Sequence, residues 1–268
     1  MEITNRNIII TGAASGIGKS LLFCLSAFRG LSVVAVDLQE TALRQTIAEL
    51  PPSTNLVIPY VCDVSTPEAV DALFDFAQTQ MGSVDIFFAN AGFAYYEQLQ
   101  KPDWPRMEAI FRVNTLSPLY SLQKMVACNA GREYAVVITA SAIAKLGIPG
   151  YALYGATKAA LDRFADAYRY ETNDLGHLCL VYPISTRTSF FDNSVSASRR
   201  GNVPVPFPSL PPETVAKAMI RGVLKDQKFV YPSLLHRVGR FVQYLAELMF
   251  IPYQLYYARV LRKWFLNG

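Results

Sequence analysis

The chain has 268 residues, of which 51% are apolar, 12% aromatic and 17% charged. These proportions exclude a largely disordered chain and fit one α/β domain with a continuous core. The net charge of +4 is too small to indicate a nucleic-acid-binding protein. The excess is concentrated near the C-terminus, where Lys228, Arg237, Arg240, Arg259, Arg262 and Lys263 face only Asp226 and Glu247.

The N-terminus, Met1 to Asn7, has no cationic stretch followed by an apolar core. We therefore expect no secretory signal and a cytoplasmic catalytic body. The cysteines lie far apart and form no CxxC pair, which predicts reduced, mostly buried thiols and neither a zinc site nor a disulfide framework. The two histidines, His177 and His236, also lack ligand spacing, so we expect no metal.

Short apolar runs alternate with longer helical patterns as far as about Ala218, which predicts βαβ units and a parallel sheet. The runs are continuously apolar, as is typical of strands buried on both faces. The expected strands are Asn7–Ile10, Ser32–Val36, Leu56–Val61, Ile86–Ala89, Ala135–Thr139 and Leu178–Tyr182. The expected helices are Lys19–Phe28, Thr41–Leu50, Pro67–Met81, Trp104–Ala127, Tyr151–Thr172 and Glu213–Leu224.

Two segments break this rhythm. Ser185 to Pro212 is rich in serine and proline, which predicts a long irregular loop of the kind that often forms a functional lid. Ser233 to Phe265 is apolar in two helical halves separated by Pro252, and this proline and the charges around it argue against a membrane-spanning helix. We expect a catalytic domain over residues 1–232 and a helical hairpin extension over 233–268.

The first expected strand ends in a glycine-rich turn that leads directly into a helix. Glycine lets the backbone approach a pyrophosphate closely, and a helix N-terminus offers N–H donors and a positive dipole end. The position of the turn between a first strand and a helix favours dinucleotide binding. The residues of this turn that we expect at the dinucleotide are Thr11, Gly12, Ser15, Gly16, Ile17 and Gly18.

Asp37 lies at the end of the second expected strand, about twenty residues beyond the glycine turn. A carboxylate there can accept hydrogen bonds from the adenosine ribose hydroxyls and would repel a 2′-phosphate. Since the turn carries Ser15 and Leu38 follows the acid, no cation stands ready for that phosphate. We expect NAD(H) in preference to NADP(H), and the alternative that Asp37 only caps the next helix stays open.

Tyr154 and Lys158 are four residues apart in a helical stretch, so their side chains share one face. An ammonium near a phenol favours the phenolate and is expected to lower the pKa of Tyr154 toward the working pH, as a general acid/base needs. Ser141 follows the strand that ends at Thr139, and its hydroxyl can hold a substrate oxygen beside the phenol.

In type, order and spacing these residues resemble the short-chain dehydrogenase/reductase family, from about Asn7 to Pro232. The resemblance implies a Rossmann-like doubly wound α/β fold and an oxidoreductase that moves a hydride between NAD(H) and an alcohol or carbonyl carbon. The elements that carry it are the turn TGAASGIG, Asp37, Asp63-Val64, Ala89-Asn90-Ala91-Gly92, Asn114, Ser141, Tyr154-Gly-Ala-Thr-Lys158, and Pro183 with Thr188.

The resemblance also implies a role for each residue. Tyr154 would exchange the proton, Ser141 would polarise the carbonyl, and Lys158 would also grip the nicotinamide ribose. Asn114 would hold a water that links Lys158 to solvent. The other expected cofactor contacts are Asp63 and Val64 at the adenine, with Leu38 nearby, Asn90, Ala91 and Gly92 beneath the cofactor, and Pro183, Thr186 and Thr188 at the nicotinamide.

Three positions depart from the common family pattern. Ala89 replaces the first of two asparagines, Ala140 precedes Ser141 where a second serine is frequent, and Ile184 stands where glycine usually follows the proline. A branched side chain at position 184 is expected to narrow or reshape the pocket beside the nicotinamide. Because the acid/base set is intact, we expect an active enzyme.

The substrate cleft is expected between the Ser141–Tyr154 side and the loop from Ser189 to Pro208. Its lining is apolar and aromatic, which favours a hydrophobic alcohol, ketone or aldehyde of steroid, retinoid or lipid type. The alternative that these side chains serve only for packing stays open. The expected lining residues are Phe93, Tyr95, Leu146, Ile148, Phe190 and Phe191, with Ala94 and Tyr96 beside them.

The sequence leaves several partners open for the hairpin. The hairpin 233–268 suits an anionic membrane surface, and it equally suits a cap over the cleft or a dimer interface. The resemblance suggests a homodimer or homotetramer.

Two rival functions stay open. One is an NAD-recycling epimerase or dehydratase of nucleotide sugars, but such enzymes usually have a larger C-terminal portion. The other is a non-catalytic dinucleotide-binding sensor or scaffold, and the intact acid/base set argues against it.

Overall fold

The computed structural model describes residues 1–97, 101–171, 175–188, 190, 208–234 and 237–239. Within these residues lies one seven-stranded sheet in the order β3-β2-β1-β4-β5-β6-β7, and every neighbouring pair is parallel. The strands are β1 (Asn7–Thr11), β2 (Ser32–Asp37), β3 (Leu56–Val61), β4 (Ile86–Ala89), β5 (Tyr134–Thr139), β6 (Gly176–Val181) and β7 (Phe229–Val230).

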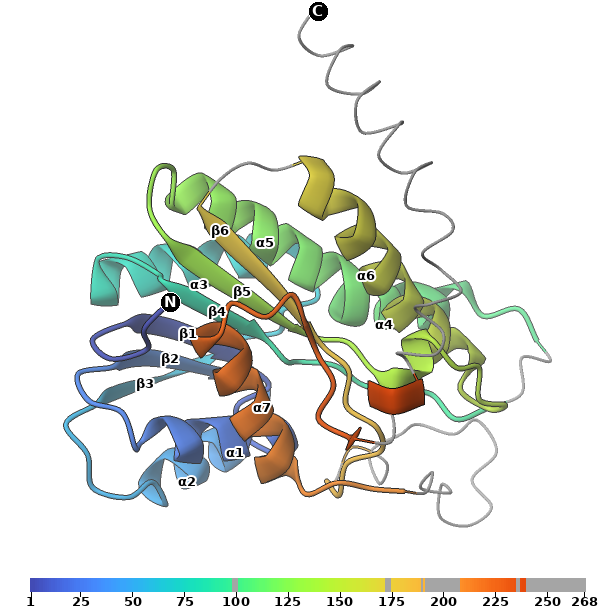
Figure 1. Cartoon of the computed structure of the whole chain (residues 1–268), viewed down its shortest axis with the longest axis horizontal. Coiled ribbons are helices and arrows are strands. Elements are labelled where there is room, and N and C mark those ends of the chain that lie inside the picture. Colours follow the sequence, from blue (N-terminus) through green and yellow to red (C-terminus); the bar gives the residue numbers. More distant parts are fainter. Residues whose placement is uncertain (98–100, 172–174, 189, 191–207, 235–236, 240–268) are drawn as a thin grey trace, which may run out of the picture.

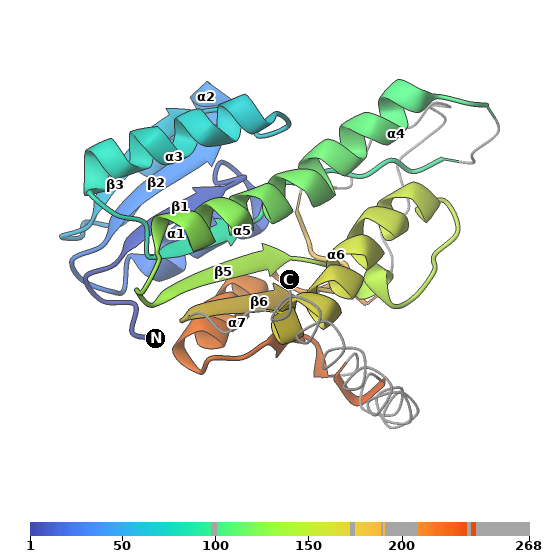
Figure 2. The same ribbon diagram turned by 90° about the horizontal axis from the view of Figure 1, so that it is seen from above.

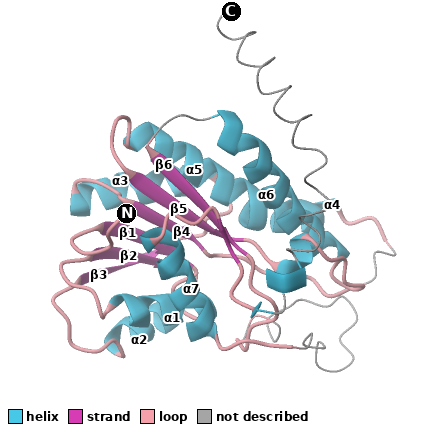
Figure 3. Ribbon diagram, in the orientation of Figure 1, coloured by secondary structure: helices cyan, strands magenta, loops and turns pink. Residues whose placement is uncertain are grey.

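Helices cover both faces of the sheet, which forms the middle layer of the molecule (Figures 1 and 3). Parallel neighbours need crossover connections, and helices supply them here. On one face lie α1 (Gly16–Leu25), α2 (Glu40–Ala48) and α7 (Pro212–Leu224). On the other lie α3 (Pro67–Met81), α4 (Trp104–Phe111), α5 (Ser117–Cys128) and α6 (Ala152–Glu171).

The strands separate two cores because successive side chains point to opposite faces. Ile8 and Ile10 pack in the core under α1, α2 and α7, whereas Ile9 packs in the core under α3, α5 and α6. All three are completely buried. The apolar runs in the sequence therefore correctly predicted a doubly wound parallel sheet with both faces covered.

The predicted helix from Trp104 to Ala127 is interrupted. Between α4 and α5 the chain makes a π-helical turn at Arg112–Leu116. The N–H of Ser117 donates to the carbonyl of Arg112, five residues back, and Pro118 has no N–H to continue the α-helical ladder. The turn places the side chain of Asn114 in the interior, where it is completely buried.

Strand β7 was not predicted. It contains only Phe229 and Val230, which pair with Leu180 and Val181 of β6. Two residues carry no periodicity that a sequence pattern can detect. The prediction of mostly buried thiols is also wrong in part, because Cys24, Cys62 and Cys128 are half-buried and only Cys179 is fully buried, although all four are free.

Much of the predicted irregular loop and of the hairpin lies outside the described residues. Of the loop, Thr186 bridges to Leu210, and the N–H of Arg187 donates to the Leu210 carbonyl at 2.9 Å. Of the extension, the N–H of Arg237 donates to the carbonyl of Ser233 at 3.0 Å, the first bond of a helical turn. No helix within the described part of the chain is long and apolar enough to cross a membrane.

The strand order reverses between β1 and β4, and the carboxyl ends of the strands face the same side. In open α/β sheets this edge is where ligands bind. Figure 2 shows α4 and the beginning of α6 on the side toward which β5 and β6 point. The sheet thus brings the ends of its strands and two of the covering helices to one place.

Candidate active site

A cleft of about 1020 Å³ occupies the carboxyl edge of the sheet. Its lining comes from the turn after β1, from the ends of β2 to β6, from α4, and from α6. Every residue expected to contact cofactor lines this cleft except Gly18. The cleft is lined by Thr11, Gly12, Ser15, Gly16, Ile17, Asp37, Leu38, Asp63, Val64, Asn90, Ala91, Gly92, Ser141, Tyr154, Lys158, Pro183, Thr186 and Thr188, among others.

The glycine turn has the backbone geometry that its sequence predicts. Gly12 has φ 67° and Gly16 has φ 52°, a region that side chains disfavour. Gly18 packs closely against this turn. A Cβ at this position would lie 1.9 Å from the carbonyl oxygen of Gly12, so Gly18 allows α1 to pack on β1 and does not itself line the cleft.

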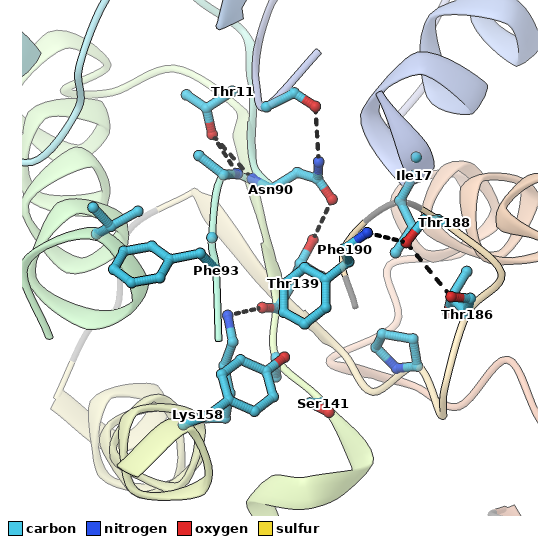
Figure 4. Close-up of a pocket in the computed structure, with 18 of the residues that line it drawn as sticks. Thr11, Ile17, Asn90, Phe93, Thr139, Ser141, Lys158, Thr186, Thr188 and Phe190 are labelled. Atoms are coloured by element: carbon cyan, nitrogen blue, oxygen red, sulfur yellow. Dashed lines mark hydrogen bonds between the residues drawn. The ribbon is translucent and has the colours of Figure 1, made fainter. Parts of the chain in front are cut away.

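A polar clamp connects the glycine turn to the centre of the sheet (Figure 4). The Thr11 hydroxyl accepts from the N–H groups of Asn90 and Ala91 at 3.0 and 3.1 Å. The Asn90 amide donates to the Gly12 carbonyl at 3.2 Å and accepts from the Thr139 hydroxyl at 3.1 Å. Asn90 therefore holds three strand ends in register beneath the cleft.

Asp37 lies at the mouth of the cleft on the far side of the glycine turn. Its carboxylate accepts from the N–H of Ala14 at 2.9 Å and from the N–H of Gln39 at 3.0 Å. Both bonds fix the side chain next to the turn. The next residue in the chain is Leu38, an apolar side chain with 65% of its surface exposed, so no cation directly follows Asp37.

Ser141, Tyr154 and Lys158 meet in the opposite wall of the cleft. Ser141 begins a 3₁₀ turn over Ala142–Ala144, and its hydroxyl accepts from the N–H of Ile143 at 3.3 Å. The Nζ atom of Lys158 lies 5.8 Å from the centre of the Tyr154 ring and donates to the carbonyl of Thr139 at 2.8 Å. The trio predicted from sequence spacing is therefore assembled on α6 and the loop after β5.

The electrostatics of the trio differ from the expectation. Burial raises the pKa of Tyr154 to about 12, although the hydrogen bond with Ser141 opposes the rise, and burial lowers the pKa of Lys158 to about 7. The prediction of a lowered tyrosine pKa is thus wrong for this arrangement. Desolvation of the phenol dominates, and the lysine directs its ammonium at the Thr139 carbonyl.

Asn114 is near this trio but does not line the cleft. Its side-chain oxygen accepts from the N–H of Phe93 at 3.0 Å, and its amide nitrogen donates to the Phe93 carbonyl at 2.8 Å and to the Thr157 hydroxyl at 3.3 Å. A Cβ at Gly92 would lie 3.7 Å from the Nζ atom of Lys158. Asn114 thus links Phe93, in the segment after β4, to α6, the helix that carries Lys158.

The segment after β6 closes the cleft on the nicotinamide side predicted from the sequence. The Pro183 carbonyl accepts from the N–H of Ala142 at 2.9 Å, which joins this segment to the Ser141 turn. A Cβ at Gly16 would lie 3.0 Å from the Thr188 methyl group, so Thr188 stands directly against the glycine turn. Ile184, the departure noted in the sequence, lines the cleft.

Four of the residues predicted to line a substrate cleft lie at this cleft: Phe93, Leu146, Ile148 and Phe190. Tyr95 does not line it. Its ring packs behind Phe93, at 5.2 Å between ring centres, and beneath the Arg106 guanidinium at 3.8 Å. Ala94 and Tyr96 pack against Tyr151 and are also absent from the lining, and Phe191 lies outside the described residues.

Several lining residues were not predicted. Tyr151 stands 6.4 Å from Tyr154, ring centre to ring centre, and is only 3% exposed. Its position three residues before Tyr154 on the same helix is a signal that could have identified it. Others come from α4, the π-helical turn and the 3₁₀ turn, which no local pattern connects to the cleft, and they include Pro105, Glu108, Ala109, Arg112, Val113 and Ile143.

The described residues contain no group of three or more His, Cys, Asp or Glu side chains that could hold a metal ion. His177 instead pairs with Asp226 at 2.8 Å, at the opposite end of β6 from Pro183. Burial lowers the pKa of this histidine. Neither residue lines the cleft.

Comparisons with known proteins agree with this geometry. The chain is 25% identical over 239 residues to estradiol 17-beta-dehydrogenase 11 of Homo sapiens, covering 86% of this chain and 75% of that protein. Two solved structures share the fold, each at 22% identity. One is a short chain dehydrogenase/reductase from Burkholderia phymatum in complex with NAD (TM-score 0.79, covering 93% of this chain and 96% of the other). The other is a short-chain dehydrogenase from Sphingobium yanoikuyae in complex with NADPH (TM-score 0.76, covering 91% and 95%).

The family model described as short chain dehydrogenase matches residues 6–197, which is most of the chain. This span contains the glycine turn, Asp37, the Asn90 clamp and the Ser141, Tyr154 and Lys158 trio. The chain therefore belongs to the short-chain dehydrogenase family and is an oxidoreductase.

Proposed function

We propose that this oxidoreductase interconverts a hydrophobic alcohol and its ketone or aldehyde, with NAD(H) as cofactor and Tyr154 as general acid/base. The observation that carries the proposal is that Ser141, Tyr154 and Lys158 line the same cleft as the glycine turn. A proton-transferring group and a dinucleotide cradle in one cleft are what reversible carbonyl reduction requires.

The residues present fit a dinucleotide. Gly12 and Gly16 have positive φ, and the N-cap residue of α1, Ser15, makes no side-chain capping bond, which leaves the helix N-terminus available to a pyrophosphate. The Ser185 hydroxyl lines the cleft and is buried without a partner among the described residues, as a group that bonds to a ligand would be. Thr186 and Thr188 flank this position.

Asp37 supports NAD(H) over NADP(H). Its carboxylate is held at the cleft by the Ala14 and Gln39 N–H groups, and a 2′-phosphate would meet this negative charge. The cations among the described lining residues are Lys158 and Arg112. Lys158 belongs to the acid/base wall, and Arg112 pairs with Glu108 at 2.7 Å, so neither is assigned to a phosphate on the ribose.

The proton chemistry follows from the desolvation of Tyr154 and Lys158. Bound nicotinamide supplies the hydride acceptor or donor. A Tyr154 phenol with a pKa near 12 is protonated at neutral pH, so it can donate a proton to a carbonyl oxygen, and the Ser141 hydroxyl can donate to the same oxygen. Lys158, with a pKa near 7, changes charge close to the working pH and favours the phenolate when it is protonated.

The substrate side of the cleft supports a hydrophobic molecule. Phe93, Ile148, Tyr151 and Phe190 surround the phenol without a charged side chain among them, and Leu146 extends the apolar surface to the rim. A human relative is named for its action on estradiol. We assign steroid-like or other lipid-like alcohols and ketones to this site on the basis of that lining.

Two further parts of the proposal concern partners. We assign the extension 233–268 to contact with an anionic membrane surface, because its apolar halves are edged by Arg237, Arg240 and Arg259, and by the pair Arg262 and Lys263. We also propose a homodimer or homotetramer, by resemblance to the family. The catalytic domain then comprises residues 1–232.

The experiment that tests the function has two steps. NADH and NADPH are titrated into the purified chain by fluorescence, and a panel of hydrophobic alcohols and ketones is then assayed at the NADH absorbance. Tight NADH binding with turnover of at least one lipid-like alcohol or ketone is expected. Tight binding without turnover across the panel would favour a non-catalytic sensor, and no binding of either dinucleotide would end the proposal.

A further inference from the structure

Behind the cleft lies a buried ionic network that the proposed chemistry does not use. The carboxylate of Asp162, on α6, pairs with the Lys145 ammonium at 2.5 Å and accepts from the Tyr182 hydroxyl at 2.6 Å. Asp162 is 3% exposed and Tyr182 is completely buried, and the Lys145 side chain is 9% exposed. None of the three lines the cleft.

Each member of the network comes from a segment that carries part of the site. Lys145 ends the 3₁₀ turn that Ser141 begins. Asp162 lies one helical turn after Lys158. Tyr182 directly precedes Pro183, whose carbonyl contacts the same 3₁₀ turn. The carboxylate therefore joins the serine loop, the acid/base helix and the nicotinamide-side segment from behind.

Stability alone is a weak reason for such a network. Taking two charges out of water costs free energy that their attraction only partly returns, and well-packed apolar side chains often serve as well. A charged carboxylate with two directional partners does fix geometry, because both partners must meet it at hydrogen-bond distance. Burial and the two carboxylates Asp162 and Asp166 raise the pKa of Tyr182, so this hydroxyl remains a donor.

The effect of the network on the site is geometric. Ser141 begins the 3₁₀ turn and Tyr154 lies on α6, and the Lys145–Asp162 pair joins these two segments.

We propose that Asp162 is a positioning residue, which with Lys145 and Tyr182 holds the 3₁₀ turn that carries Ser141 against α6 beside Tyr154. The inference rests on the proposed function for its catalytic consequence, though not for its structural one. Asp162 touches neither cofactor nor substrate. Its removal should lower turnover and leave dinucleotide binding largely intact.

The chain supplies a matched control. Asp71 on α3 contacts Lys124 at 2.8 Å and the Tyr120 hydroxyl at 2.9 Å, both from α5. This is the same set of side chains, but none of the three lines the cleft, and the Asp71 side chain is 42% exposed. Asp71→Asn therefore removes a carboxylate with equivalent partners away from the site.

The test compares Asp162→Asn, Lys145→Met, the double variant, and Asp71→Asn in the full chain. For each single variant of the network we expect kcat to fall by about 10- to 100-fold with the NADH dissociation constant changed less than about threefold. The double variant should lose less than the product of the single losses, because no buried charge is left unpaired. Asp71→Asn should keep wild-type kcat.

Melting temperatures identify any variant that fails to fold, and the double variant then provides the comparison. Wild-type kcat in a folded Asp162→Asn protein would overturn the proposal, and so would equal losses in kcat and NADH affinity. A crystal structure of Asp162→Asn separates this proposal from the proposed function. An increased distance between the Ser141 and Tyr154 oxygens relative to wild type supports positioning even if no substrate is found, and an unchanged distance refutes it.

Discussion

The Nζ atom of Lys158 lies 5.8 Å from the centre of the Tyr154 ring, while its hydrogen bond goes to the backbone carbonyl of Thr139. Desolvation disfavours the charged form of both side chains in this arrangement. Under the proposed function, protonated Lys158 would favour loss of the Tyr154 proton.

Tyr154→Phe should abolish turnover and leave cofactor binding nearly unchanged. The substitution removes the only atom of the side chain that can exchange a proton, and general acid/base catalysis contributes about 10²- to 10⁴-fold. Steady-state kinetics and NADH fluorescence titration measure the two effects separately. Normal turnover by this variant would show that another group exchanges the proton.

Lys158 should make stability depend on pH between about 7 and 10.5, its pKa values in the folded and unfolded chain. In this window the unfolded chain holds the proton and the folded chain does not, so stability rises with pH. Below pH 7 the folded chain has to hold a charged amine in its interior, so Lys158 lowers the stability of the folded state most in this range. Urea unfolding of wild type and Lys158→Met from pH 6.5 to 9 should show wild type gaining up to about 1.4 kcal/mol per pH unit relative to the variant. A constant difference would contradict the lowered pKa.

Asp37→Ala should weaken NADH binding more than NADPH binding. Hydrogen bonds to a charged group contribute about 1.5–3 kcal/mol, so the loss for NADH should be about tenfold or more. NADPH should bind no worse, because a repelling charge is removed. Asp37→Asn, which can still accept from the Ala14 N–H, controls for the shape of the turn. A larger loss for NADPH in fluorescence titrations would reverse the cofactor assignment.

Leu146→Ser should raise KM for hydrophobic substrates. Leu146 is 64% exposed at the rim of the cleft, so a substrate that covers it gains apolar contact. The serine variant loses the apolar contact of part of a leucine side chain with the substrate, so we expect KM to rise by about three- to tenfold. Leu175→Ser is the control, because Leu175 is 60% exposed and does not line the cleft. Equal KM values for the two variants would argue against substrate contact at the rim.

The extension should bind anionic membranes. Full-length protein is expected to float with vesicles of phosphatidylcholine and phosphatidylserine, and binding should fall in high salt as the cationic edge is screened. Arg259→Glu combined with Arg262→Glu reverses the charge and should abolish flotation, as should ending the chain after Ser233. Flotation that is the same with neutral vesicles would exclude the electrostatic contribution.

Much of the fold could be predicted because its elements are local and strongly patterned. Strands buried on both faces leave continuous apolar runs, so β3 and β4 matched their predicted bounds, Leu56–Val61 and Ile86–Ala89. The helix Pro67–Met81 was also exact, since a proline begins it and Gly82, with φ 76°, ends it. The π-helical turn escaped because its hydrophobic spacing resembles that of a regular helix.

The parts of the site that depend on residues close together in the sequence could be predicted. The parts that depend on contacts between distant segments could not. Tyr154 and Lys158 share one helix, so their proximity follows from their separation. The exclusion of Tyr95 depends on the Arg106 guanidinium stacked on its ring, a contact that no local pattern contains. The pKa of Tyr154 is raised by desolvation, which the spacing to Lys158 does not reveal.

The π-helical turn at Arg112–Leu116 fixes the number of residues that the chain needs between Trp104 and Cys128. A turn of this kind accommodates one residue more than an α-helical turn, so the segments before and after it are out of phase with a regular helix. Grafting an uninterrupted helix of equal length from another protein would rotate everything beyond the junction by about 100°. Loop exchange and chimaera design in this chain must therefore leave the stretch from Trp104 to Cys128 intact.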